Sequence, residues 1–214
     1  MIHVLITVKP SERLPNKNLF FSQKTFAWLF QEIAYIQEAV KVYTVGFRSE
    51  LPECLPFGWE HIECDTGSHL EDCRFACDKI AAIRGSAISG DVFVQPLLSQ
   101  PFRRQRLLAD AVAATREHGS AVSVCMAKDL SWRNVVVSDG KAKLCGIERS
   151  EDLRPYLDGA IYAWKPENLD SIFDKSASHG FVVNYTGFPC DIDHNTDIPP
   201  GFQLSYSEFL FGRK

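Results

Sequence analysis

Short apolar runs alternate with amphipathic stretches along most of this 214-residue chain. The first run, Ile2–Val8, has no helical spacing and is long enough for a strand that is buried on both faces. The further runs of this kind are Lys41–Val45, Asp91–Val94, Ala121–Met126, Ala160–Trp164 and Phe181–Asn184. Strands that alternate with helices are joined by right-handed crossovers. The pattern therefore predicts an α/β fold with a mostly parallel sheet and helices on both faces.

Three helices are expected between these strands. Apolar residues recur at helical spacing in Lys24–Val40. A second helix, Leu70–Ile83, has Ser68 as its expected N-cap. A third, Arg103–His118, is expected to end at the glycine that follows it.

A β-hairpin is expected where the alternation is interrupted, from Trp132–Val137 and Lys141–Cys145 around a Ser-Asp-Gly turn. We expect it to leave the sheet as a flap or as a dimer contact. Phe202–Leu210 is expected to form a closing helix. No repeat, low-complexity tract or flexible linker divides the chain, so residues 1–214 are expected to form a single domain.

Composition narrows the functional classes. A net charge of −4 argues against a broad nucleic-acid surface, although not against a local phosphate pocket. No apolar run approaches the roughly 18–20 residues that span a bilayer, and no secretory signal precedes the first strand. The seven cysteines are scattered and odd in number, as is typical of reduced thiols. A cytoplasmic protein is therefore expected.

An acidic cluster near the end of the chain points to a metal. Asp191 and Asp193 are separated by one residue, so they point to the same side of an extended segment, and Asp197 follows. Like charges held this close favour a shared cation, and carboxylate oxygens suit Mg²⁺. The alternative is a polar loop before the Pro199–Gly201 breaker, because Asp and Asn are good turn formers.

The first strand runs into a basic loop, Lys9–Asn18, which holds cations, neutral donors and two prolines. Ligands of α/β proteins bind outside the carboxyl ends of the strands, so a phosphate is expected here. Arg13 and Lys17 supply charge, while Ser11 and Asn18 supply neutral donors. The alternative is an ordinary solvated surface loop.

Six short segments, taken in order, carry a family resemblance. In the basic loop, the residues in register with Arg-Gly-Gly-Ser-Lys-Arg-Ile-Pro-x-Lys-Asn-Ile are Ser11, Arg13, Leu14, Pro15, Lys17, Asn18 and Leu19. The later segments are Asp65–Ser68, Val94–Pro96 with Ser99, Pro101 and Arg103, Trp132-Arg133, Gly159–Tyr162, and Asp191–Asp193 with Asp197. In these segments the chain resembles the sugar-acid cytidylyltransferases, that is, the CMP-sialic acid synthetases and, more distantly, the CMP-Kdo synthetases.

The resemblance implies a Rossmann-like nucleotidyltransferase that transfers CMP from CTP to a sialic-acid-like (nonulosonic) sugar acid, with Mg²⁺ as cofactor and pyrophosphate as second product. Lys17, Arg13 and Asp193 are the expected catalytic residues, and Asp191 and Asp193 the expected metal ligands. The residues expected to contact the nucleotide are Lys9, Ser11, Asn18, Asp65, Thr66 and Ser68. Those expected to contact the sugar acid are Gln95, Arg103, Arg133, Gly159 and Tyr162. The family also implies a homodimer.

Several of these residues have a structural alternative. Ser68 and its neighbours would equally cap the following helix, Arg103 would start a helix, and Arg133 would lie on the exposed face of the hairpin. Tyr162 lies on an apolar strand and suits the core as well as a ligand.

The chain also departs from the family pattern. Val8 stands where the family has arginine, Lys9-Pro10 replaces two glycines, and Glu12 replaces a lysine. Val-Lys-Pro after the first strand resembles the phospholactate guanylyltransferases instead. Two alternatives therefore stay open, the same fold with another base or acceptor, and a non-catalytic nucleotide-binding or partner-binding domain.

Overall fold

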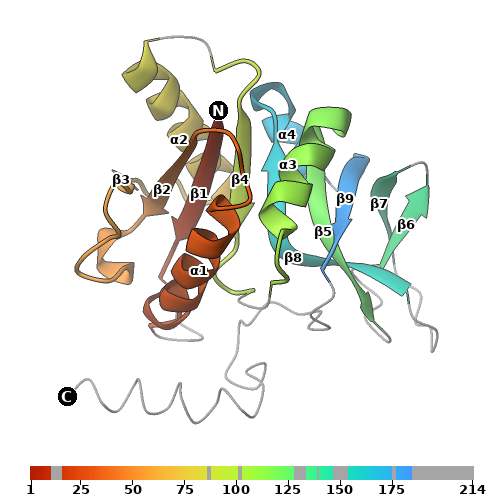
Figure 1. The fold of residues 1–214 in the computed structure, drawn as a ribbon, viewed down its shortest axis with the longest axis horizontal. Coiled ribbons are helices and arrows are strands. Elements are labelled where there is room, and N and C mark those ends of the chain that lie inside the picture. Colours follow the sequence, from red (N-terminus) through yellow and green to blue (C-terminus); the bar gives the residue numbers. More distant parts are fainter. Residues whose placement is uncertain are drawn as a thin grey trace.

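In the computed structural model of the chain, nine strands pair into one mixed sheet in the order β3-β2-β1-β4-β8-β5-β9-β7-β6 (Figure 1), counted over the residues that the structure describes. These are residues 1–10, 16–85, 88–100, 103–127, 134–138, 140–146, 154–174 and 177–184. The strands are β1 (Ile2–Val8), β2 (Val40–Gly46), β3 (Glu60–Glu63), β4 (Val92–Pro96), β5 (Ser120–Ala127), β6 (Asn134–Ser138), β7 (Lys141–Gly146), β8 (Arg154–Trp164) and β9 (His179–Val183). The helices are α1 (Lys17–Ile33), η1 (Arg48–Glu50), α2 (His69–Arg84), α3 (Leu107–His118), η3 (Pro166–Asn168) and α4 (Leu169–Ile172).

The first half of the sheet is parallel, as the alternation of strands and helices predicts. β1 pairs in parallel with β2 and with β4, and β2 pairs in parallel with β3. All seven residues of β1 are buried, because helices cover both faces of this central strand. β3 was not expected, since its sequence Glu-His-Ile-Glu contains one apolar residue.

The second half of the sheet is mixed, and β8 is the reason. This strand runs antiparallel to both β4 and β5, whereas β5 and β9 are parallel. The predicted hairpin is present as β6 and β7, but it continues the same sheet, because β7 pairs with β9 and Asn134 of β6 pairs with Tyr156 of β8. The hairpin therefore extends the sheet and does not interrupt it.

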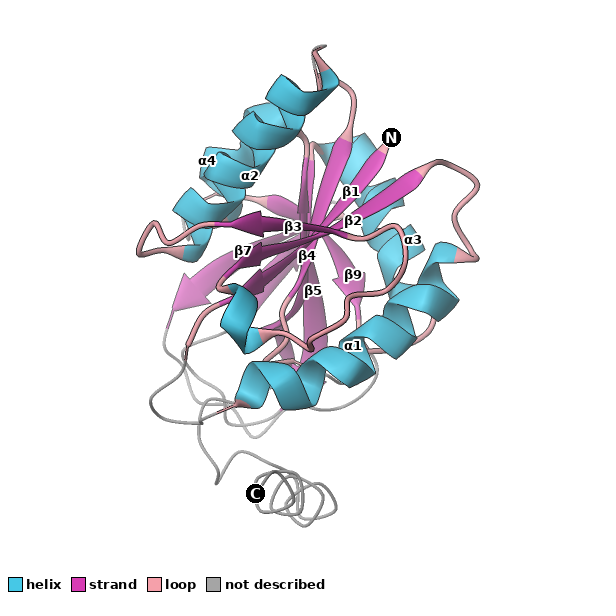
Figure 2. Ribbon diagram, turned by 90° about the vertical axis from the view of Figure 1, so that its left-hand side faces the viewer, coloured by secondary structure: helices cyan, strands magenta, loops and turns pink. Residues whose placement is uncertain are grey.

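Two apolar cores lie on opposite faces of the sheet. Figure 2 shows α1 and α3 on one face and α2 and α4 on the other. Alternate residues of β1 divide between them: Ile2, Val4, Ile6 and Val8 belong to the core beneath α1 and α3, and Leu5 belongs to the core beneath α2 and α4. The predicted placement of helices on both faces is confirmed.

The helices begin and end differently from the predicted ranges. α1 starts at Lys17 and ends at Ile33, so the expected helix Lys24–Val40 is shifted toward the N-terminus. α2 starts directly after its predicted cap, Ser68. α3 starts at Leu107, not at Arg103, and ends at the predicted Gly119, whose φ is 84°. The expected helix Phe202–Leu210 lies outside the described residues, and the single-domain assignment of 1–214 stays a prediction. Within the described ranges, no helix has the length and apolarity needed to cross a bilayer.

Candidate active site

The carboxyl ends of four strands, β1, β4, β5 and β9, lie along the same edge of the sheet. β1 is parallel to β4, β9 is parallel to β5, and β8 lies antiparallel between β4 and β5. The basic loop follows β1 at this edge, and Asn184, the residue after β9, leaves from it toward the acidic cluster. The two candidate motifs, which are far apart in sequence, therefore follow strands that end at the same edge, where α/β proteins bind ligands.

Lys9 is held at this edge by an ion pair with Asp72 of α2. The Lys9 Nζ atom lies 3.1 Å from Asp72 Oδ2, and the Asp72 side chain is fully buried. Thr66 donates to Asp72 Oδ1 from its backbone nitrogen at 3.3 Å and from its hydroxyl at 2.7 Å, and Cys64 Sγ donates at 3.4 Å. Burial alone would raise the pKa of Asp72, but the donors from Thr66, Lys9 and Cys64 hold that pKa below its ordinary value. Asp72 is thus a charged anchor for Lys9 and Thr66.

The same carboxylate keeps Cys64 in its thiol form. Burial and, after it, the nearby negative charge of Asp72 raise the pKa of Cys64 to about 12. A protonated thiol is a poor nucleophile, so these surroundings do not activate Cys64 for covalent chemistry.

Asn18 closes the base of the loop. Its Nδ2 atom donates to the Lys9 carbonyl at 2.6 Å and to Glu50 Oε2 at 2.9 Å. At Gly46, the last residue of β2, a Cβ atom would lie 2.1 Å from the Val8 carbonyl oxygen, so glycine lets the ends of β1 and β2 lie this close. The buried amide of Asn18 is therefore engaged with the protein, which favours positioning of the loop over direct contact with a nucleotide. Lys17 precedes it as the first residue of α1 and is half-buried.

Ser68 caps α2, which is the structural role that the sequence offers as the alternative to nucleotide contact. Its hydroxyl oxygen accepts from the Glu71 backbone nitrogen at 3.2 Å and donates to Glu71 Oε2 at 3.1 Å. The serine and the glutamate three residues later thus form a variant of the capping box. Asp65 is exposed at the same edge.

Gln95 lies at the end of β4 within a buried polar group. Its Nε2 atom donates to Thr7 Oγ1 at 2.8 Å, and His69 Nδ1 lies 3.1 Å from the same oxygen. Gln95 is fully buried, and its Oε1 atom has no hydrogen-bond partner among the described residues. An acceptor of this kind is costly to leave unpaired, which is compatible with a ligand donor in the bound state.

Arg103 points into the protein. Its Nε atom donates to the Ala160 carbonyl and its Nη1 atom to Thr25 Oγ1, both at 3.1 Å, and its Nη2 atom donates to the Leu97 carbonyl. The guanidinium also lies 4.9 Å from the centre of the Trp28 ring. Burial lowers the pKa of Arg103 to about 9. These contacts favour a structural cross-link over the predicted contact with a sugar acid.

Gly159 and Tyr162 lie on β8 beside the end of β4. Gly159 has a φ of 71°, a conformation that suits glycine, at the point where the register between β5 and β8 shifts. Tyr162 pairs with Gln95 across the strands, and its ring lies 5.3 Å from that of Phe173. Tyr162 therefore contributes to the packing beneath α4, next to the Gln95 group.

The remaining predicted site residues lie outside the described residues: Ser11, Arg13, Arg133, Asp191 and Asp193. Across the part of the chain that the structure describes, no group of three or more His, Cys, Asp or Glu side chains is placed to hold a metal. The Mg²⁺ assignment therefore rests on the carboxylates of the acidic cluster.

Sequence reasoning missed two parts of this edge, Asp72 and the pair of Thr7 and His69. The signal for Asp72 was available, since the residue stands on the buried face of α2 beside Cys73, Ala76 and Cys77. A charge on an apolar helix face needs a partner. Thr7 carried no comparable signal, because threonine is common in buried strands.

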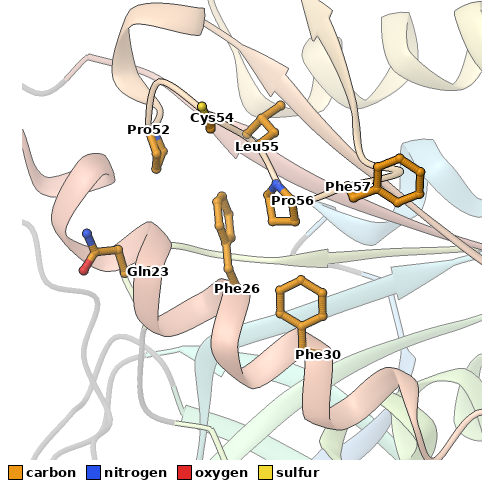
Figure 3. A pocket seen from close by; sticks show the side chains of 8 residues that line it. All are labelled: Gln23, Phe26, Phe30, Pro52, Cys54, Leu55, Pro56 and Phe57. Atoms are coloured by element: carbon orange, nitrogen blue, oxygen red, sulfur yellow. The ribbon is translucent and has the colours of Figure 1, made fainter.

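An apolar pocket lies apart from this polar edge. It is open, has a volume of about 690 Å³, and forms between α1 and the connection from η1 to β3 (Figure 3). Its lining residues are Gln23, Phe26, Phe30, Pro52, Cys54, Leu55, Pro56 and Phe57. It shares no residue with the polar edge and offers no charge for a triphosphate, so it is not assigned to the candidate active site.

Comparison with known proteins places the fold. No protein-family model matches the sequence, and neither does any curated protein. Among solved structures, CMP:2-keto-3-deoxy-manno-octonic acid synthetase in complex with CTP is similar with a TM-score of 0.66 and 15% identity, over 99% of both chains. The chain shares the overall fold of this synthetase. HddC from Yersinia pseudotuberculosis in complex with GMP-PN gives 0.61 and 12%, over 98% of this chain and 100% of that one. The inositol-1-phosphate CTP transferase of T. maritima gives 0.54 and 11%, over 99% and 96%.

Proposed function

We propose that this protein is a Mg²⁺-dependent nucleotidyltransferase that transfers CMP from CTP to a sialic-acid-like sugar acid and releases pyrophosphate. The observation that carries the proposal is the shared sheet edge. β1 and β9 end there, one followed by the basic loop and the other by the chain that leads to the acidic cluster. Transfer from a triphosphate needs cationic side chains and a metal ion to stabilise the developing charge, and the basic loop and the acidic cluster would supply them.

The basic loop would hold the phosphates. Lys17 and Arg13 would neutralise the charge that grows on the leaving pyrophosphate, with Lys9 and Ser11 assisting. The Lys9–Asp72 ion pair supports a positioning role for Lys9, because it fixes the start of the loop at the edge. Asp65 and Thr66 would contact the nucleotide from the start of α2.

Asp191 and Asp193 would hold Mg²⁺, since a pair of carboxylates is the donor set that this ion prefers. When bound, the ion supplies charge stabilisation at the α-phosphate and lowers the pKa of the attacking hydroxyl. Gln95 would accept a hydrogen bond from the acceptor through its unpaired Oε1 atom, with Gly159 and Tyr162 beside it. Arg133 would pair with the carboxylate of the acid.

A second candidate keeps the reaction and changes the base or the acceptor. Lys9 stands in place of a family glycine, and HddC, one of the similar structures, is a complex with GMP-PN. Lys9, held by Asp72, would change the shape and contacts of the loop beside the nucleotide and so which base fits.

A pyrophosphate-release assay with each of four nucleoside triphosphates and a panel of sugar acids tests both candidates. Acid-dependent release with CTP supports the leading proposal, and release only with GTP selects the alternative. Tight nucleotide binding without release from any pair would instead identify a non-catalytic domain.

A further inference from the structure

Asp158 is a fully buried carboxylate in the middle of β8 to which the proposed chemistry gives no part. Its Oδ1 atom accepts from the Ala160 backbone nitrogen at 3.0 Å and from the Ser123 hydroxyl. Its Oδ2 atom accepts from Asn184 Nδ2 at 2.8 Å. Burial raises the pKa of Asp158, and these three donors oppose the shift. A charge buried at this cost needs an explanation.

Asp158 lies within a bulge of β8. Val122 of β5 pairs with Tyr162, whereas Val124 pairs with Leu157, so β8 carries extra residues around Asp158 and Gly159. β5 lies between β8 and β9 in the sheet (Figure 1). Asp158 therefore links β8 to the end of β9 across an intervening strand.

Asn184 also forms hydrogen bonds with the connection between β4 and α3. Its Oδ1 atom accepts from the Arg104 backbone nitrogen at 3.1 Å, and Arg104 Nε in turn donates to the Val183 carbonyl at 2.5 Å. Gln100, in the same connection, donates to the Asp158 carbonyl at 2.9 Å. Both ends of the Asn184 amide are therefore used, one for Asp158 and one for Arg104.

The two segments joined here are the ones that the reaction must bring together. The β4–α3 connection follows Gln95, and Asn184 is the last described residue before the acidic cluster, with Asp191 seven residues further on in sequence. We propose that Asp158 is a positioning residue that, through Asn184, fixes where the acidic segment leaves the sheet relative to the β4–α3 connection. The link to metal binding rests on the proposed function, whereas the link between the two segments does not.

The geometry makes a sharp prediction for Asp158→Asn. Asp158 faces donors on both sides, so an amide there must turn its own amino group toward one of them. If that group faces Asn184, the Asn184 amide has to rotate and place its amino group against the Arg104 N–H, which breaks the Arg104 hydrogen bond. Exchanging the two residues, Asp158→Asn with Asn184→Asp, again places an acceptor opposite each N–H group. The hydrogen bonds to the backbone nitrogens of Ala160 and Arg104, and the one between the two exchanged side chains, can then all form.

Hydrogen–deuterium exchange on the ligand-free protein tests the positioning role without any assay of activity. In Asp158→Asn, exchange at the Arg104 amide should become faster by about tenfold, because its acceptor, Asn184 Oδ1, no longer faces it. The Asn184 backbone amide donates to the Val124 carbonyl at 2.7 Å and lies outside this row of hydrogen bonds. The double variant should return the Arg104 amide to its wild-type rate. Asp91→Asn is the control. It removes another buried carboxylate, which pairs with His3 at the edge where β1 and β4 begin, and it should leave the Arg104 amide unchanged.

The Mg²⁺ dependence of turnover then tests the link to the metal. Asp158→Asn should raise the Mg²⁺ concentration for half-maximal turnover by roughly tenfold, with little change in the KM for the nucleotide, and the double variant should reverse the change.

Unchanged exchange in Asp158→Asn, or a double variant as impaired as the single one, would overturn the proposal. If Asp158→Asn does not fold, folding of the double variant supports the proposal and its failure to fold overturns it. A wild-type protein without turnover would refute the proposed function alone, because the exchange experiment still decides the role of Asp158.

Discussion

The ammonium of Lys9 lies 3.1 Å from Oδ2 of Asp72, and this oxygen has no other partner among the described residues. Lys9 stands where the cytidylyltransferases that the chain resembles have a glycine. The departure from the family pattern is therefore accompanied by a specific partner on α2. Lys9 and Asp72 therefore fix the start of the basic loop at the sheet edge.

Lys9→Met should reduce the free energy of unfolding by about 1–3 kcal/mol, because it leaves a buried carboxylate without its cation. Urea unfolding at pH 7 measures the change. Lys41→Met is the matched control, because Lys41 pairs with Glu60 on the surface, and it should cost at most about 1 kcal/mol. Equal effects of the two variants would contradict the anchoring role.

Asp72→Asn should change how stability depends on pH. The folded pKa of Asp72 is held below its ordinary value, so its ionised form stabilises the fold. That contribution is complete above about pH 4 and is lost as the pH falls through the folded pKa. The difference in unfolding free energy between wild type and variant should therefore shrink below pH 4. A constant difference down to pH 2 would show that the charge is not responsible.

Glu32→Ala should destabilise the protein by roughly 2–4 kcal/mol, because two backbone N–H groups at the start of α3, one of them buried, lose their acceptor. Glu32 is fully buried in α1, and its carboxylate accepts from the backbone nitrogens of Arg106 at 2.6 Å and Leu108 at 2.9 Å, at the start of α3. Urea unfolding checks the value, with Glu117→Ala on the exposed surface of α3 as the control, expected within about 0.5 kcal/mol of wild type. A loss below about 1 kcal/mol for Glu32→Ala would show that water replaces the carboxylate.

The elements with strong local signals were predictable from sequence. β1 matches its predicted range, Ile2–Val8, because five of its seven residues are aliphatic. Ser68 as a cap and Gly119 as a helix end also follow from local chemistry, and both are confirmed. Ends that depend on distant contacts were not predictable. The first half of α1 was missed because three residues on its buried face are polar, so the apolar spacing of a helix is interrupted there. These residues are Asn18, Ser22 and Thr25.

The candidate site shows the same division. Arg103 looks like a ligand residue in sequence, but Thr25, Leu97 and Ala160 take its donors, and no local pattern reveals those contacts. The predicted start of α3, at Arg103, was also wrong. Arg106 adopts a left-handed conformation with a φ of 62° just before the helix, and the sequence gives no sign of it. What the sequence did indicate is the chemistry of the two motifs. That β1 and β9 end at the same edge required the sheet order.

Lys17→Ala should weaken nucleotide binding and lower turnover together, because phosphate charge is present in both the ground state and the transition state. Calorimetric titration with CTP measures the first effect and initial rates measure the second. Lys24→Ala, one residue past the second turn of the same helix, is the control and should change neither. An unchanged affinity in Lys17→Ala would remove this residue from the phosphate site.

The protein should form a two-fold dimer that includes the hairpin β6–β7. The hairpin lies at the far end of the sheet order, and its sequence carries Val135, Val136 and Val137 in a row. Sedimentation at micromolar concentration should give about twice the 24.1 kDa chain mass. A fully active monomer would contradict this prediction.

In the proposed reaction, the acceptor's oxygen attacks the α-phosphate and displaces pyrophosphate, and the acidic cluster is required. The most direct measurement is mass spectrometry of the product formed from CTP, Mg²⁺ and a sugar acid, with pyrophosphate counted in parallel. We predict a CMP–acid ester and pyrophosphate in equal amounts, and at least a hundredfold slower formation of both in Asp193→Ala, roughly the loss expected when a metal ligand is removed. Free CMP without an ester, or an Asp193→Ala variant as fast as wild type, would contradict the account.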